Sequence, residues 1–252
     1  MKLREPILFC WSGGKDSAMA LHTLLLQNDV RVAALLTTVT EGRVPGFVLA
    51  NPGSTEDRIS MHGVRRELLR QQAESIGLPL HEVLIPPQCV NPVYEARMEE
   101  AVLSHYTQGV RRVAFGDIFL EDLRLYREKN LARAQMTAFF PIWKRDTREL
   151  SAHFIASGFR AVAVCIDPAK LDPSFAGREL DTSFFRDLPP TVDPCGENGE
   201  FHTFVFAGPI FHKPINIRRG EVVHRDGFVF CDLVAEDRIP VTPEIRSSPL
   251  QG

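Results

Sequence analysis

The amino-terminal segment of this chain constrains its fold more than any other stretch. Residues 7–11 form a continuous apolar run, residues 12–17 form a small polar loop with two glycines, and residues 18–26 are strong helix formers. A continuous apolar run of this length is typical of a strand buried on both faces. A buried strand that passes through a glycine-containing loop into a helix predicts the start of a parallel α/β sheet.

The alternation of strand and helix continues through the first half of the chain. We expect further strands at residues 30–36, 81–85 and 112–115, and helices at residues 64–76, 91–106 and 120–136. Asn91, followed by Pro92, is expected to cap its helix, and residues 41–60 contain too much Gly and Pro to form one element. This order predicts a parallel sheet flanked by helices, with right-handed crossovers, in a first domain of residues 1–141.

The pattern changes beyond residue 141. Asp146 is expected to cap a helix that runs to Ser157. Strands are expected at residues 161–166, 201–206, 215–217, 221–224 and 228–233, with turns at Arg219-Gly220 and Asp226-Gly227. We therefore predict a second, smaller α+β domain of residues 142–237. Residues 238–252 contain three prolines and little apolar surface, which predicts a mobile tail.

Composition and charge exclude several classes of protein. The 252 residues are 44% hydrophobic and 24% charged, which rules out a largely disordered chain. With 29 Lys and Arg against 32 Asp and Glu, the net charge of −3 provides no global basic field for nucleic acid. No apolar run approaches the roughly 20 residues of a membrane helix. Residues 1–6 lack the apolar core of a signal peptide, so we expect a cytoplasmic protein without a membrane partner.

The cysteines point to reduced thiols. Five are scattered along the chain: Cys10, Cys89, Cys165, Cys195 and Cys231. An odd, unclustered set argues against a disulfide framework and against a structural zinc site. Cys195 lies beside two glutamates and could be a nucleophile, but no paired thiol motif accompanies it. The sequence favours a small structural cysteine there.

The loop of residues 12–17 carries the chemistry of the first domain. It reads Ser12-Gly13-Gly14-Lys15-Asp16-Ser17. The glycines allow close backbone approach, and the helix that follows offers free N–H donors and the positive end of its dipole, so the loop suits a polyphosphate. Lys15 is expected to be an exposed loop lysine. The loop is not a Walker A motif, because the leading glycine would fall at Phe9 and Asp16 replaces the Ser or Thr. The alternative is a tight turn that happens to carry a lysine.

The loop resembles the pyrophosphate loop of the adenine-nucleotide α-hydrolase-like (HUP) superfamily. Enzymes of that superfamily cleave ATP between the α and β phosphates, adenylate a substrate oxygen and release pyrophosphate. Residues 58–65, 115–118, 140–143 and 195–204 narrow the resemblance to the diphthine–ammonia ligase family, over about residues 7–233. The resemblance implies a Rossmann-like HUP-type sheet. It also implies an ATP-dependent, amide-forming ligase that adenylates a carboxylate and amidates it with ammonia or an amine.

The resemblance also implies roles for individual residues. The phosphates of ATP would be bound by Ser12, Gly13, Gly14, Lys15, Asp16 and Ser17, with Asp16 near Mg²⁺. The adenosine would lie among Thr38, at the end of the second strand, and Met61, His62 and Gly63, and the pocket would be closed by Gly116 and Asp117. Glu197 and Glu200 would face the activated carboxylate and the incoming ammonia. The catalytic set would be Lys15, Asp16, Glu197, Glu200 and His202.

His202 is a departure from the family pattern. In members associated with diphthamide synthesis the string reads G-E-x-G-E-[FY]-E-T, and His202 stands in place of its last glutamate. Diphthine carries a quaternary ammonium that an acidic neighbour would attract. The departure therefore predicts a carboxylate-bearing acceptor other than diphthine. The alternative is that His202 only hydrogen-bonds within its strand.

Other interpretations stay open from the sequence alone. His62 could be an ordinary loop histidine, Asp117 a helix cap, Glu197 and Glu200 a solvated turn, and Arg127 part of an exposed helix face. The chain could be an ATP- or AMP-binding regulatory protein of the same superfamily. It could also be an RNA-modifying adenylyl or thiol transferase, which its charge and cysteine spacing disfavour. Homo-oligomerisation is left open.

Overall fold

The parallel sheet expected from the sequence is present. The structure is a computed structural model that describes residues 4–41 and 63–236, and its first sheet has the strand order β3-β2-β1-β4-β5. All four pairings are parallel. The strands are β1 (Glu5–Cys10), β2 (Val30–Thr40), β3 (Leu80–Ile85), β4 (Arg112–Ala114) and β5 (Thr137–Phe139). This Rossmann-like order confirms the predicted fold class.

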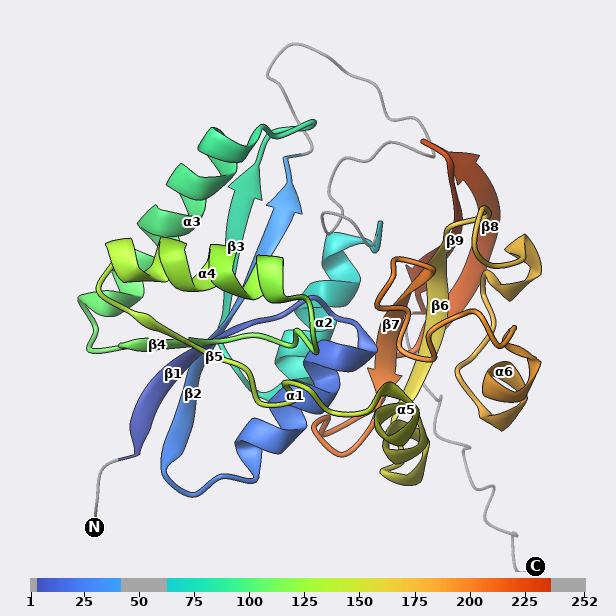
Figure 1. Ribbon diagram of the computed structural model, residues 1–252, viewed down its shortest axis with the longest axis horizontal. Coiled ribbons are helices and arrows are strands. Elements are labelled where there is room, and N and C mark those ends of the chain that lie inside the picture. The colour runs from blue at the N-terminus through green and yellow to red at the C-terminus, as the bar shows by residue number, and fades with distance from the viewer. Residues whose placement is uncertain (1–3, 42–62, 237–252) are drawn as a thin grey trace, which may run out of the picture.

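Helices cover both faces of this sheet (Figure 1). They are α1 (Lys15–Leu25), α2 (Arg66–Ile76), α3 (Asn91–Tyr106) and α4 (Glu121–Arg133). Strand β1 is buried on both faces, because Phe9 packs in the same cluster as residues of α1 and α2, whereas Leu8 packs with residues of α3 and α4. The continuous apolar run that opens the chain is therefore the centre of the sheet.

The second half of the chain forms a smaller antiparallel sheet. Its order is β7-β6-β9-β8, and its pairings are antiparallel. The strands are β6 (Arg160–Ile166), β7 (Phe201–Ala207), β8 (Ile217–Arg225) and β9 (Phe228–Ala235). With them come the helices α5 (Thr147–Ala156) and α6 (Thr182–Asp187) and the 3₁₀ turn Pro173–Phe175. These elements have the α+β character expected for the second half.

The two sheets share one hydrophobic core. The cluster that contains Phe9 on β1 and Leu21 on α1 continues into Phe154 on α5 and Phe204 on β7. Helices α1 and α2 lie between the two sheets (Figure 1), where α1 contacts β7 and α5 and α2 contacts β9. The loop before α1 therefore lies where the two sheets meet.

Several local expectations are confirmed. Asp146 caps α5, because one carboxylate oxygen accepts the backbone N–H groups of Arg148 and Glu149 at 2.9 and 3.0 Å. Asp226 and Gly227 form the turn between β8 and β9, both with positive φ angles (52° and 83°), as tight hairpin turns require.

Other local expectations are wrong. Arg219 and Gly220 do not form a turn; they lie within β8, where the register with β9 shifts between Arg219 and Val222. Glycine is common at such a bulge as well as in turns, and the sequence does not separate the two. Asn91 is not the cap of α3 but its first residue, and Val90 holds the cap position without a side-chain hydrogen bond.

Element ends also differ from the expectations. Strand β2 continues past Thr38 to Thr40, because β3 pairs with it along this length. Helix α4 ends at Arg133 instead of residue 136, and Gln135 with φ of 55° turns the chain into the edge strand β5. A strand of three residues is too short to show a period in the sequence.

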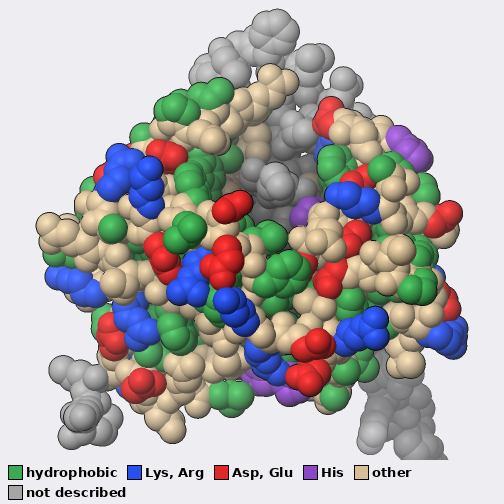
Figure 2. All heavy atoms as spheres, viewed as in Figure 1, with side chains coloured by type: hydrophobic (Ala, Val, Ile, Leu, Met, Phe, Trp, Pro, Cys, Tyr) green, Lys and Arg blue, Asp and Glu red, His purple; other side chains and the backbone are tan. Residues whose placement is uncertain are grey.

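Some expectations fall outside the described residues: the irregular stretch 42–60, Met61, His62 and the tail 238–252. Within residues 4–41 and 63–236, no helix has the length and apolarity needed to cross a membrane. On the face shown in Figure 2, positively and negatively charged side chains are interspersed among the described residues, in line with the small net charge.

Candidate functional site

A pocket of about 300 Å³ opens at the carboxyl ends of β1, β2 and β4, where open α/β sheets bind ligands. Of the residues predicted for the site, seven line it: Ser12, Asp16, Ser17, Thr38, Gly116, Asp117 and Glu197. Other lining residues come from the same strand ends and from α3 and α4: Cys10, Trp11, Leu36, Thr37, Tyr94, Met98, Phe115, Leu120 and Arg127. The pocket therefore joins predicted residues from segments far apart in the sequence.

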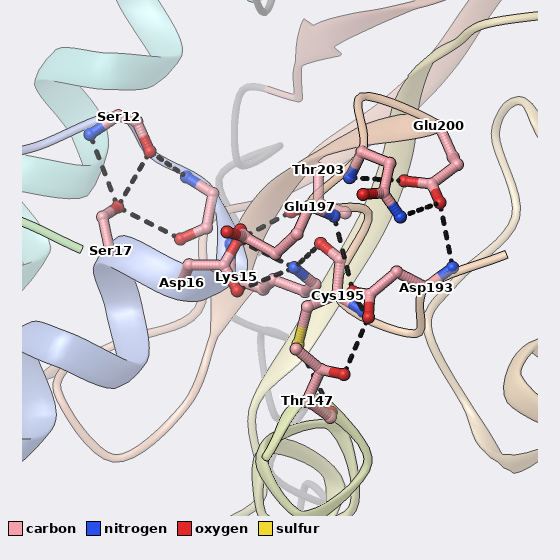
Figure 3. A network of polar contacts seen from close by, with 12 residues as sticks. Ser12, Lys15, Asp16, Ser17, Thr147, Asp193, Cys195, Glu197, Glu200 and Thr203 are labelled. Atoms are coloured by element: carbon pink, nitrogen blue, oxygen red, sulfur yellow. Dashed lines mark hydrogen bonds and ion pairs between the residues drawn. The ribbon is translucent and has the colours of Figure 1, made fainter. Parts of the chain in front are cut away.

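The loop from β1 to α1 is held by its own hydroxyl groups (Figure 3). The hydroxyls of Ser12 and Ser17 lie 3.0 Å apart, Gly14 donates its N–H to Ser12 Oγ at 3.3 Å, and Ser17 Oγ donates to the Gly14 carbonyl at 3.2 Å. Gly13 has a φ of 81°, in the left-handed region that favours glycine. The loop thus has a defined shape, with Ser12, Asp16 and Ser17 facing the pocket.

Lys15 is buried, which contradicts the expectation of an exposed loop lysine. Its relative exposure is 3%, because the 193–200 segment packs over the start of α1. The ammonium donates to both carboxylate oxygens of Asp16 at 2.7 Å and to the carbonyl of Cys195 (Figure 3). Burial lowers the pKa of Lys15, but Asp16, Cys195 and Glu197 together raise it, so the pKa lies above its ordinary value. Lys15 is a charged link between the two halves of the protein.

Glu200 is buried within its own loop. Its carboxylate accepts the backbone N–H groups of Asp193 and Asn198, both at 2.9 Å, and the Asn198 side-chain amide at 3.0 Å. Burial tends to raise the pKa of Glu200, but these hydrogen bonds lower it below the ordinary value. Glu200 therefore holds the loop in shape and is not among the residues that line the pocket. That it faces the substrates stays a prediction.

Glu197 is the residue of this loop that lines the pocket. Burial raises the pKa of Glu197 to about 8, and the negative charges of Asp16, Asp117 and Asp193 add to this effect. Its carboxyl group is therefore mostly protonated at neutral pH in the ligand-free protein. A cation that enters the pocket would favour the ionised form of this carboxyl group and so lower the pKa of Glu197.

Asp117 is paired with Arg127, a residue that the sequence favoured as part of an exposed helix face. The guanidinium donates to the two Asp117 oxygens at 2.6 and 3.1 Å and lies 4.3 Å from the centroid of the Phe115 ring. Asp117 does not cap α4, whose cap position is Leu120. The helical repeat could have indicated that Arg127 points inward. Leu131 lies four residues further on the same face of α4 and is a buried apolar residue.

Gly63 and His202 are not among the residues that line this pocket. Gly63 lies beside Phe230 and lines a separate pocket against β8 and β9. His202 is on β7 opposite Cys165. Burial, with a smaller effect of Lys15, lowers the pKa of His202, so its imidazole is neutral at neutral pH.

Cys195 behaves as a structural residue. All five cysteines are unpaired thiols. Cys195 is buried, its thiol donates to the Thr147 carbonyl at 3.4 Å, and burial raises its pKa to about 12. A thiol with this pKa is not a thiolate nucleophile at neutral pH, which supports the structural reading of Cys195.

Two family models match the chain: "Diphthamide synthase N-terminal domain" over residues 6–134 and "Diphthamide synthase C-terminal domain" over residues 146–237. The chain belongs to the diphthamide synthase family. This confirms the resemblance found in the sequence. The first match covers the parallel sheet from β1 to the end of α4, and the second begins at Asp146, the cap of α5.

Curated proteins of this family align with between two thirds and nearly the whole of the chain. The diphthine–ammonia ligase of Bos taurus is 28% identical over 262 residues, covering 94% of this chain and 95% of the relative. The diphthine–ammonia ligase of Homo sapiens is 26% identical over 257 residues, covering 92% of this chain and 93% of the relative. The diphthine–ammonia ligase of Danio rerio is 30% identical over 195 residues, covering 67% of this chain and 75% of the relative.

A substitution at Gly116 tests whether the pocket at the strand ends depends on close backbone packing. A Cβ added there would lie 2.9 Å from both Cα and N of Ser17. Because these are backbone atoms, Gly116→Ala should displace the loop of residues 12–17, the predicted phosphate loop. We expect a loss of stability of about 1–3 kcal/mol and at least about tenfold weaker binding of a non-hydrolysable ATP analogue. Urea unfolding and calorimetric titration measure the two effects.

A second glycine serves as the control for that substitution. Gly220→Ala, in β8, meets Asp232 at 3.3 Å and lies outside the phosphate loop, so analogue binding should be unchanged. Normal analogue affinity in a folded Gly116→Ala protein would contradict the importance of this contact.

Proposed function

We propose that this chain is an ATP-dependent ligase that adenylates a carboxylate and converts it to an amide with ammonia or another amine. The observation that carries the proposal is the pocket that Ser12, Asp16 and Ser17 of the phosphate loop share with Glu197 from the second half of the chain. The curated relatives named diphthine–ammonia ligase support an amide-forming reaction.

The proposed reaction has two steps on the same pocket. The acceptor carboxylate attacks the α-phosphate of ATP, and pyrophosphate leaves. The amine then attacks the activated carbonyl, and AMP leaves. We propose that Ser12, Gly13, Gly14 and Ser17 bind the phosphates through backbone N–H groups, hydroxyls and the dipole of α1. Catalysis is then mainly positioning and charge neutralisation.

We further propose that Asp16 binds Mg²⁺ together with the phosphates. Its side chain is 28% exposed and lines the pocket, while its contact with Lys15 holds it in place. Within residues 4–41 and 63–236, no cluster of three His, Cys, Asp or Glu side chains could hold a metal ion alone. This fits Mg²⁺, which commonly takes one or two carboxylates plus substrate phosphates. The ion would neutralise charge on the pyrophosphate.

The remaining roles follow from position. We propose that Thr38 and Asp117 contact the nucleoside side of ATP, with Gly116 allowing the end of β4 to approach the backbone of Asp16 and Ser17 closely. Glu197 would face the amine, and Glu200 would keep that loop in shape. The domain boundary is proposed between residues 134 and 146, the interval between the two family matches, which contains the predicted division at 141/142. The unpaired cysteines support a reducing compartment such as the cytoplasm.

The test is the identity of the products. Purified protein is incubated with Mg-ATP, ammonium and pools of carboxylic acids, and nucleotides are separated by chromatography. We expect AMP and pyrophosphate in equal amounts, dependent on an acceptor, and their loss in Asp16→Asn. ADP and inorganic phosphate as products would contradict the proposal. Tight ATP binding without AMP in the presence of every acceptor would instead support a regulatory nucleotide-binding protein.

His202 provides a prediction about the acceptor. Its imidazole is neutral, so it does not offer the negative charge that a glutamate would present to the quaternary ammonium of diphthine. A charge contact at a partly buried site is worth about 1–3 kcal/mol, or roughly tenfold or more in acceptor preference. We expect the wild-type protein not to amidate a diphthine-bearing elongation factor, and His202→Glu to gain that activity. Mass spectrometry of the elongation factor measures the amidation.

The control for this prediction is His224→Glu, an exposed position on β8, which should not gain activity. Efficient amidation of diphthine by the wild-type protein would show that the departure at His202 does not exclude this acceptor.

A further inference from the structure

Strand β7 of the antiparallel sheet contacts the phosphate loop directly. Val205 donates its N–H to the carbonyl of Gly13 at 2.9 Å. Lys15 donates its backbone N–H to Thr203 Oγ1 at 3.0 Å. Since Lys15 is the first residue of α1, its N–H is one of the helix-end donors that have no partner within the helix. In this protein that donor is taken by a side chain from the other sheet.

Gln72 of α2 completes the same junction. Its side chain is fully buried, and its amide nitrogen donates to the carbonyls of Gly13 and Val205 at 3.1 and 2.6 Å. Its amide oxygen accepts the indole N–H of Trp11 at 3.0 Å. Every hydrogen of the amide and its oxygen are therefore used. Such a fully satisfied buried amide defines the position of each partner, because an unsatisfied one would be costly.

The close approach at Gly13 shows how tightly the loop is held. A Cβ there would lie 2.8 Å from the amide oxygen of Gln72, and the residue also has a positive φ. The carbonyl of Gly13 accepts from two sides, from Gln72 and from Val205. The peptide group between Gly13 and Gly14 is thus oriented by residues outside the loop.

We propose that Thr203 and Gln72 are positioning residues that hold the phosphate loop in its nucleotide-binding conformation, so that polyphosphate binding by the parallel sheet depends on β7. This rests on the proposed function, since it takes the loop to bind the phosphates of ATP. Strand β7 begins at Phe201, directly after the loop that contains Glu197. The same strand therefore positions the phosphate loop and the loop of residues 193–200, which we call the amine-side loop, relative to each other.

The test separates phosphate binding from general stability. Thr203→Val keeps the shape of the side chain and removes the acceptor for the Lys15 N–H, whereas Thr203→Ser keeps the hydroxyl. Each protein is titrated with a non-hydrolysable ATP analogue and, by competition, with adenosine. We expect Thr203→Val to bind the analogue about tenfold more weakly, with unchanged adenosine binding. We expect Thr203→Ser to stay within about twofold of wild type for both ligands.

A second variant addresses Gln72 without removing its whole network. Trp11→Phe removes one donor to the amide oxygen and leaves the two bonds to Gly13 and Val205. We expect about threefold weaker binding of the analogue. Because Trp11 also lines the pocket, the adenosine titration measures any direct loss of contact with the nucleoside. This variant still allows the affinity for the analogue to be measured if Thr203→Val fails to fold.

The outcomes distinguish this inference from the proposed function. Wild-type affinity for the analogue in folded Thr203→Val and Trp11→Phe proteins would overturn the inference. Equal weakening for adenosine and the analogue would also overturn it, because the contact would then be merely structural. If wild-type protein binds the analogue no more tightly than adenosine, the proposed function fails instead.

Discussion

Lys15→Met is expected to lower the free energy of unfolding by about 3 kcal/mol and to abolish ATP-dependent turnover. The lysine is 3% exposed, and its ammonium is bonded to the Asp16 carboxylate and the Cys195 carbonyl. Without it, a largely buried carboxylate loses its partner and the link from α1 to the amine-side loop is broken. Urea unfolding measures the first effect, and AMP formation the second.

A double substitution separates the two effects. Lys15→Met with Asp16→Asn removes the unpaired charge, so it should recover most of the lost stability. It should stay inactive, because Asp16 is proposed to bind Mg²⁺ and the link from Lys15 to the Cys195 carbonyl stays broken. Lys144→Met is the control, since Lys144 pairs with Glu121 at the surface and its side chain is 67% exposed. It should change neither quantity by a measurable amount. Normal turnover by folded Lys15→Met protein would contradict the proposed role of the loop.

Glu200→Gln is expected to lower the free energy of unfolding by about 2 kcal/mol while leaving nucleotide binding intact. The carboxylate accepts three N–H groups, and an amide in either orientation directs an N–H group at one of these donors. The loop that positions Glu197 should loosen, so amide formation should fall by at least about tenfold. The ATP analogue should still bind, because Glu200 does not line the pocket.

Calorimetric titration with the analogue and an assay of amide formation check this result. Glu149→Gln, at an exposed carboxylate in the first turn of α5, is the matched control and should behave as wild type. If folded Glu200→Gln protein no longer binds the analogue, Glu200 belongs to the nucleotide site and the proposed division between the two sheets is wrong.

The parallel sheet and the position of its site could be predicted from local features. The apolar run of β1 has no polar face to expose, so it must lie inside a sheet covered on both sides, as Phe9 and Leu8 do. The carboxyl end of such a strand, followed by two glycines and a helix start, is where ligands bind. Asp146 could be assigned because an N-cap depends only on groups two or three residues away.

Elements with weak local signals could not be predicted. Strand β5 has three residues and exists because β4 pairs with it at the sheet edge. Gly220 continues β8 because β9 lies beside it, although the same dipeptide is common in turns. The pairing partner decides both cases, and it is far away in the sequence or lies across a hairpin.

Local periodicity and strings of neighbouring residues were enough to predict the strand–loop–helix at the start of the chain, the parallel type of the first sheet and the family. Four facts came from the three-dimensional contacts alone. Lys15 is buried, Arg127 pairs with Asp117, Glu197 and not Glu200 lines the pocket, and Thr203 accepts a backbone N–H group of α1. Each of these facts depends on packing or hydrogen bonding between elements. Such contacts form only when the second sheet packs against α1 and α2, and no local pattern records them.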